Sequence, residues 1–140
     1  MKKIVLVMSI LFIGFSFQAQ EVKKDKKEQK VKKNKNAKVS FEVNGICGMC
    51  KKRIETAALK TKGVKFAIWD VKTHQMNLIM DERKTTLNTI KQNIANVGHD
   101  IEGFIASDEA YNSVHACCKY RDSKIVLDHE SGAMKKQKNE

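Results

Sequence analysis

Apolar and polar positions along this chain become regular at position 39. Val39, Phe41 and Val43 alternate with polar residues, and this period of two predicts a half-buried strand. Between positions 50 and 61 the apolar residues recur at helical spacing instead, with charged residues off the stripe. Gly63 follows and supplies the left-handed exit with which helices commonly end. The pattern therefore predicts a strand followed by an amphipathic helix.

Two more alternating runs come next, separated by a polar connection at positions 71–74. Short alternating runs joined in this way predict the two strands of a β-hairpin. The alternating apolar residues are Val64, Phe66 and Ile68 in the first run and Met76, Leu78 and Met80 in the second.

A second amphipathic helix is predicted after the hairpin, beginning at a Thr85 or Thr86 cap and ending at Gly98. Residues 101–105 predict a short last strand. The resulting order, βαββαβ, is satisfied by one antiparallel sheet with both helices on one face, because that arrangement buries a single core. We therefore expect an α+β domain over 39–106. The apolar face of its second helix consists of Leu87, Ile90, Ile94 and Val97.

A C-terminal extension, residues 107–140, follows this domain. Ser107 is placed to cap a short helix that has two acidic residues in its first turn and leads to Cys117-Cys118. From position 119 onward the sequence is mostly polar, and its pattern assigns no further element.

The first twenty residues have the features of a secretory signal peptide. Lys2 and Lys3 precede an apolar run that reaches Phe17, and a small residue, Ala19, lies near the exit. The run is too short to span a bilayer comfortably. We therefore expect residues 1–20 to be removed on export to the periplasm or the exterior.

The strongly basic balance of the chain is concentrated in one segment. The formal net charge is +11, and residues 21–38 contain nine Lys against three acids, whereas residues 39–140 contain 16 basic and 13 acidic residues. The segment lacks an apolar pattern and is expected to be a disordered linker. The charge thus argues against a folded nucleic-acid-binding face and leaves only a weak contact of the linker with anionic surfaces.

The four cysteines form two close pairs, Cys47-x-x-Cys50 and Cys117-Cys118, and are not spread along the chain as cysteines that form disulfides between loops often are. Cys47 is expected on a loop and Cys50 in the first turn of the first helix, whose N-terminal partial charge favours thiolates. Two soft sulfur ligands without nearby acids suit Cu(I), with Hg(II) and Zn(II) as alternatives.

The residues around this motif resemble the heavy-metal-associated domain family. The resemblance rests on Val43 to Glu55, then Lys62-Gly63-Val64, then Asn96 to Asp100, and covers about half of the chain. It implies a ferredoxin-like fold, a metal bound between Cys47 and Cys50, and transfer of the ion to a docked partner. Such a partner is a metal donor or acceptor, for example a copper-transporting ATPase or an efflux component. In one departure from the family, only Ile46 separates Gly45 from Cys47.

Four further residues are candidate ligands. His99 follows the second helix, on a loop that lies beside the metal loop in the family. If the short helix folds back along the domain, Cys117 and Cys118, with His115 nearby, would join the first pair in a four-thiolate or two-metal site.

We expect a metal-binding protein that buffers or transfers its ion without turning over a substrate. Two alternatives stay open at the level of sequence. The Cys-Gly-Met-Cys dithiol also resembles a thiol-disulfide oxidoreductase site, although this chain has no Pro and thus lacks the cis-Pro loop of thioredoxin-like proteins. In the other alternative, the basic linker makes the protein an envelope-surface adaptor and the cysteines are structural.

Overall fold

The computed structural model describes residues 32–131 of the chain. The expected signal peptide, most of the expected linker and residues 132–140 lie outside this range. Seven helices and strands and one 3-10 helix make up the described part: β1 (Ala37–Glu42), α1 (Gly48–Lys60), β2 (Val64–Trp69), β3 (Gln75–Met80), α2 (Leu87–Ala95), α3 (Asp108–Asn112), η1 (Ala116–Cys118) and α4 (Ser123–Glu130).

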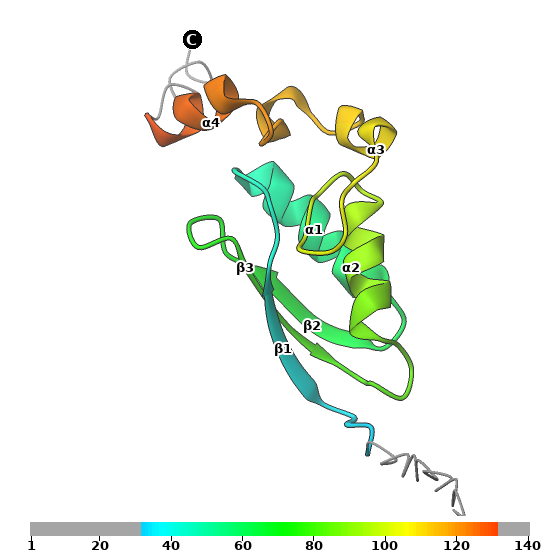
Figure 1. The fold of residues 1–140 in the computed structure, drawn as a ribbon. Helices are drawn as coiled ribbons and strands as arrows, with labels where there is room; N and C mark the ends of the chain where they lie inside the picture. The colour runs from blue at the N-terminus through cyan, green and yellow to red at the C-terminus, as the bar shows by residue number, and fades with distance from the viewer. Residues whose placement is uncertain (1–31, 132–140) are drawn as a thin grey trace, which may run out of the picture. The chain divides into compact units, whose positions relative to one another are not determined.

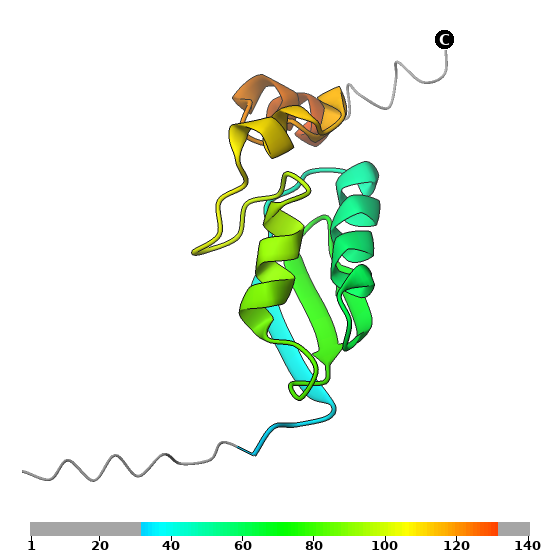
Figure 2. The ribbon, with the colours of Figure 1, turned by 90° about the vertical axis from the view of Figure 1, so that its right-hand side faces the viewer.

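The three strands form one antiparallel sheet in the order β1-β3-β2. Leu78 at the centre of β3 pairs with Val39 of β1 on one side and with Ala67 of β2 on the other. Helices α1 and α2 lie side by side on the same face of this sheet (Figures 1 and 2). This arrangement confirms the predicted ferredoxin-like α+β fold.

The core lies between the sheet and the two helices. Ile54 of α1 and both Ile90 and Ile94 of α2 are fully buried against the sheet, as the helical periodicity predicted. Thr86 caps α2 through its side chain, which accepts a hydrogen bond from Thr89 N–H at 3.2 Å. The predicted caps and stripes therefore place the helices correctly.

The inward face of β2 is opposite to the predicted one. Phe66 and Ile68 are 46% and 45% exposed, while Ala67 and Trp69 point into the core. An irregularity between Val64 and Phe66 shifts the pairing register, and the Trp69 indole takes the interior position. A change of phase by one residue moves every side chain of a strand to the other face.

The predicted last strand at residues 101–105 is also wrong as a full strand. Ile101 makes an isolated antiparallel bridge with Val43 beside β1, and then the chain folds back on itself. Ile101 and Phe104 exchange two backbone hydrogen bonds across a turn in which Gly103 has φ +79. The turn therefore uses the backbone groups that a longer fourth strand would have paired.

Two boundaries differ from those predicted. β1 begins at Ala37, so the last two positions of the expected linker belong to the sheet. In the C-terminal extension, Ser107 caps α3 as predicted, but residues 125–127, which the sequence left unassigned, lie in helix α4. Among residues 32–131, no helix is long and apolar enough to cross a membrane.

Candidate metal centre

The loop between β1 and α1 is held on both sides before it reaches Cys47. Asn44 N–H donates to the carbonyl oxygen of Asp100 at 2.8 Å, and the Asn44 carbonyl accepts from His99 Nδ1 at the same distance. At Gly45, an added Cβ would lie 3.0 Å from the Cβ of Cys50 and 3.1 Å from the ring of Trp69. The loop is therefore packed closely enough to fix where Cys47 begins helix α1.

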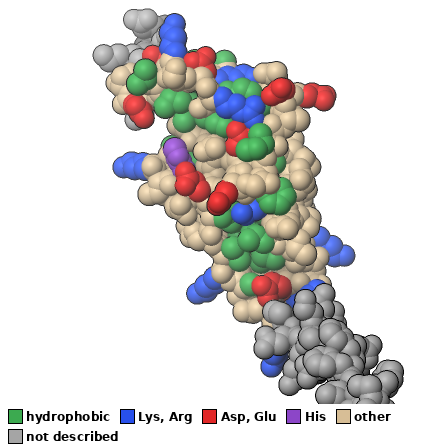
Figure 3. All heavy atoms as spheres, in the orientation of Figure 1, with side chains coloured by type: hydrophobic (Ala, Val, Ile, Leu, Met, Phe, Trp, Pro, Cys, Tyr) green, Lys and Arg blue, Asp and Glu red, His purple; other side chains and the backbone are tan. Residues whose placement is uncertain are grey.

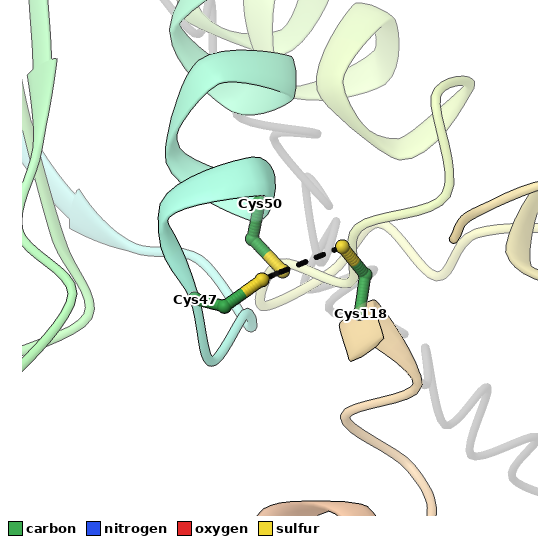
Figure 4. A group of neighbouring side chains, drawn as sticks. All are labelled: Cys47, Cys50 and Cys118. Carbon is green, nitrogen blue, oxygen red and sulfur yellow. Dashed lines mark hydrogen bonds between the residues drawn. The ribbon is translucent and has the colours of Figure 1, made fainter. Parts of the chain in front are cut away.

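Three sulfur atoms meet at this point, as Figure 4 shows. Cys47 Sγ lies 3.4 Å from Cys50 Sγ and 3.5 Å from Cys118 Sγ, and all three sulfurs lie within 4.8 Å of one another. Cys50 and Cys118 are buried, Cys47 is half-buried, and all are free thiols. We call these three residues the inner thiol cluster.

The spacing of the inner thiol cluster fits a shared soft ion. Thiolates about 2.3 Å from one metal ion lie about 3.8 to 4.0 Å apart in tetrahedral or trigonal geometry. The observed separations are slightly shorter and need only small rotations of the side chains. No carboxylate or imidazole joins this group within the described residues. A purely sulfur donor set favours soft ions such as Cu(I).

The three thiols share their protons unequally. The hydrogen bond from Cys50 lowers the pKa of Cys47 to about 4, although burial acts in the opposite direction. The same hydrogen bond, together with burial, raises the pKa of Cys50 well above its usual range, and burial raises that of Cys118 to about 12. These shifts favour one thiolate in the cluster at neutral pH, so binding of an ion by all three sulfurs would release the remaining protons.

Cys117 stands at the edge of this cluster rather than in it. Its Sγ lies 3.8 Å from Cys47 Sγ and 3.9 Å from Cys118 Sγ. His115, another candidate ligand, approaches Cys117 Sγ with its Nδ1 atom at 3.2 Å. The extension therefore folds back along the domain, and all four cysteines and His115 lie at one end of it. This is the arrangement that the sequence suggested.

His99 is not part of the group of close sulfur atoms. The side chain is fully buried and stacks on Tyr120, with ring centroids 5.6 Å apart. Its Nδ1 atom supports the Asn44 carbonyl, and its Nε2 atom has no hydrogen-bond partner among residues 32–131. Burial lowers the pKa of His99, so the ring is neutral. The structure uses it to hold the metal loop and leaves it outside the group of close sulfurs.

The extension is fixed to the domain by polar contacts that the sequence did not reveal. Arg121 donates two hydrogen bonds to Asp100, at 2.9 and 2.7 Å, and a third to the carbonyl oxygen of Ala106. Tyr120 donates to the carbonyl oxygen of Gly98 at 3.0 Å. These contacts, here called the latch, hold η1 where Cys118 reaches the first pair.

Two other side chains also have roles that the sequence did not indicate. His129 Nε2 donates to the carbonyl oxygen of Cys117 at 2.9 Å, so α4 supports the segment that carries the second cysteine pair. Lys51, beside the metal loop, is engaged with Glu55 and with the carbonyl oxygen of Trp69. No local pattern distinguishes such residues from solvent-exposed charges.

Charges of both signs are interspersed on the face of the molecule in Figure 3, with hydrophobic groups between them. This distribution agrees with the near balance of charge after position 38. The folded part shows no uniform basic surface on that face.

Comparison with known proteins finds solved structures that are similar to slightly less than half of the chain. Among solved structures, a CopZ metallochaperone is 27% identical, covers 46% of this chain and 98% of its own, and has a TM-score of 0.45. Apo-CopP from Helicobacter pylori is 26% identical over 46% of this chain and 98% of its own, with a TM-score of 0.43. Oxidized MerP from Ralstonia metallidurans CH34 is 20% identical over 47% and 99%, with a TM-score of 0.40. No curated protein matches the chain.

The family model of the heavy-metal-associated domain matches residues 40–100. The match includes Cys47 and Cys50 and ends before Cys117 and Cys118, which the extension supplies. Residues 40–100 of this chain thus form a heavy-metal-associated domain.

Proposed function

We propose that this protein binds Cu(I) through Cys47, Cys50 and Cys118 and either buffers the ion or passes it to another protein. The observation that carries the proposal is the meeting of three sulfur atoms within 4.8 Å of one another. Three thiolates hold a soft monovalent ion without further donors, whereas structural Zn(II) sites take four ligands. Hg(II) and Zn(II) are the competing ions.

Transfer occurs by ligand exchange, with no turnover of a substrate. A thiolate or thioether of the partner attacks the ion while one protein thiolate leaves. Cys47 is the first to leave, because it is half-buried whereas Cys50 and Cys118 are 0% and 1% exposed. The oxidation state of the ion does not change in this step.

The setting of this exchange is the periplasm or the exterior. Residues 1–20 have the composition of a signal peptide, and the Lys-rich segment 21–38 then tethers the domain. The partner is a metal-donor or metal-acceptor protein, such as a copper-transporting ATPase or an efflux component. The match to the heavy-metal-associated domain supports this part of the proposal.

Anaerobic titration of the reduced chain with Cu(I), in competition with a chromophoric chelator, tests the proposal. We expect Cys47→Ser to lower the affinity by more than about a hundredfold, because it removes a direct ligand. Asn112→Ala, an exposed change on α3, serves as the control and leaves the affinity unchanged. Wild-type affinity in Cys47→Ser, or tighter binding of Zn(II) than of Cu(I), would contradict the assignment.

One observation also favours a thiol-disulfide oxidoreductase. Cys47 has a lowered pKa, and its sulfur lies 3.4 Å from Cys50, as in an attacking and resolving pair. Catalytic reduction of insulin disulfides by the protein distinguishes this function from metal binding. We expect no catalysis above the rate of free dithiol.

A further inference from the structure

Three soft donor side chains lie just outside the inner thiol cluster: Met49, His115 and Cys117. We propose that they form an access site that takes an incoming Cu(I) first and passes it inward. The proposal rests on the Cu(I) binding proposed above and adds a loading route to it.

The three donors come from two parts of the chain and meet at Cys117. The Cys117 thiol donates to Met49 Sδ at 3.5 Å, and His115 Nδ1 lies 3.2 Å from the same sulfur. Met49 is the second residue of α1, whereas His115 precedes η1 in the extension. Thioether, imidazole and thiolate are all donors that bind Cu(I).

The His115 ring presents an unprotonated nitrogen on the side that faces Cys117. Its Nδ1 atom accepts a hydrogen bond from the Cys117 backbone N–H at 3.3 Å, so this nitrogen does not carry the proton. An unprotonated ring nitrogen is the form of histidine that binds metal ions.

The exposure of the donors separates an outer set from an inner set. Met49 is 49% exposed, His115 is exposed, and Cys117 is half-buried. Cys50 and Cys118 have almost no contact with solvent. An ion that arrives from solvent therefore meets the outer donors before it reaches those two sulfurs.

Cys117 and Cys47 connect the two sets. Their sulfurs are 3.8 Å apart, so one ion can contact both. Cu(I) first binds Cys117, whose thiol releases its proton to water, together with Met49 and His115. The His115 Nδ1 atom gives up the hydrogen bond from the Cys117 backbone N–H in this step. The Cys47 thiolate then forms a bond to it as Met49 leaves. Cys118 next binds and releases its proton to water as His115 leaves. Cys50 then binds and releases its proton to water as Cys117 leaves and takes a proton back. Copper stays in the +1 state throughout.

Loading kinetics test this route. Cu(I) is supplied as its bathocuproine disulfonate complex to the reduced full chain under anaerobic conditions, and the loss of the complex's absorbance gives both rate and equilibrium. We expect Cys117→Ser to slow loading about tenfold while the final affinity stays within about twofold of wild type. Met49→Leu and His115→Gln are expected to slow it about threefold each.

Two further variants control the experiment. Leu59→Met exchanges the same pair of side-chain types on α1 at a position that is also 49% exposed, and is expected to load at the wild-type rate. Cys118→Ser is expected to show the reverse of Cys117→Ser, with a lower affinity and an unchanged initial rate.

The outcomes separate the access site from the proposed function. If Cys117→Ser loads at the wild-type rate, or loses affinity as Cys118→Ser does, the access site is wrong while Cu(I) binding stands. If the wild-type chain removes no Cu(I) from the chelator, the proposed function itself fails, and the access site with it.

Discussion

The heavy-metal-associated domain and the C-terminal extension are held in place by different kinds of contact. The domain buries a continuous set of large apolar side chains between its sheet and two helices. In the extension, by contrast, α3 and α4 contain no buried residue, and Val114 and Cys118 are its only buried side chains within the described chain. Its attachment depends on the latch between Asp100, Arg121, Tyr120 and Gly98.

Because of this difference, the positions of Cys47 and Cys50 depend on the stability of the domain, whereas the position of Cys118 depends on the docking of the extension. Burial of apolar area is the main favourable contribution to folding, so the domain is expected to unfold as a unit. A segment held by a few polar contacts opens at a lower free energy than the whole fold. The third thiol can therefore leave the cluster while Cys47 and Cys50 stay in place.

Ile54→Ala is expected to have the largest effect, because it acts on both regions at once. Ile54 is fully buried in α1, and its truncation should lower the free energy of unfolding by about 3 kcal/mol. Urea denaturation followed by circular dichroism measures this change. Ile68→Ala, at a 45% exposed position of β2, is the control, with an expected loss below about 1 kcal/mol. If amide hydrogens of the extension stayed protected from exchange after the domain had unfolded, the extension would not depend on the domain.

Gly98→Ala is expected to act mainly on the docking of the extension. Gly98 has φ +94, and an added Cβ would lie 2.6 Å from both the carbonyl oxygen of Ala110 and Cγ1 of Val114. Gly103→Ala is the matched control, because Gly103 also has a positive φ, +79, but its added Cβ would meet nothing within 4 Å.

Both glycine variants should lose about 1–2 kcal/mol to backbone strain. Only Gly98→Ala should also increase amide hydrogen exchange across residues 107–131. Equal exchange in the two variants would show that Gly98 is not a docking point.

Arg121→Gln is expected to loosen the extension without unfolding the domain. It leaves Asp100 without its charged partner, which should cost about 1–3 kcal/mol of docking free energy. Hydrogen exchange in the extension should rise while the domain keeps its denaturation midpoint. The control is Arg83→Gln, which removes a similar two-bonded pair with Asp81 and should leave exchange in the extension unchanged.

Acid should weaken the latch in the wild-type protein, with a smaller effect than the substitutions at neutral pH. Burial alone would raise the pKa of Asp100, but hydrogen bonds from Arg121 and from Ala106 N–H outweigh it and lower the pKa. The docked state therefore favours the ionised carboxylate. Its contribution is complete above the unfolded value of about 3.9 and is lost as the pH falls through the lower folded value.

Hydrogen exchange of the extension, measured from pH 6 down to pH 3 and corrected for intrinsic rates, should show this loss. In Asp100→Asn the docking should be weaker but no longer depend on pH in that range. A pH dependence that persists in this variant would assign the effect to another carboxylate.

Much of the domain could be predicted from the sequence because its periodicity is produced by burial. The stripe through Ile90 and Ile94 and the Thr86 cap are local features, and the structure has them where they were expected. The phase of β2 was wrong because the shift between Val64 and Phe66 depends on pairing with β3, which a pattern within one strand does not contain.

The candidate metal centre also has a part that could be predicted from the sequence and a part that could not. The place of Cys47 and Cys50 at the start of α1 followed from neighbouring residues in the sequence. Cys118 reaches them through the docking of the extension, to which the contact of Arg121 with Asp100, 21 residues earlier, contributes. This is a tertiary contact between side chains and has no local pattern. The stacking of His99 on Tyr120 of the extension could not be predicted for a similar reason.

The chain contains a single tryptophan, and its position gives the protein an optical probe. The indole of Trp69 donates from Nε1 to the carbonyl oxygens of Val43 and His74, and its ring lies against the backbone of Gly45, two residues before Cys47. Its fluorescence therefore arises from one fixed place beside the metal loop. Loading and release of an ion can be followed through this emission without a label.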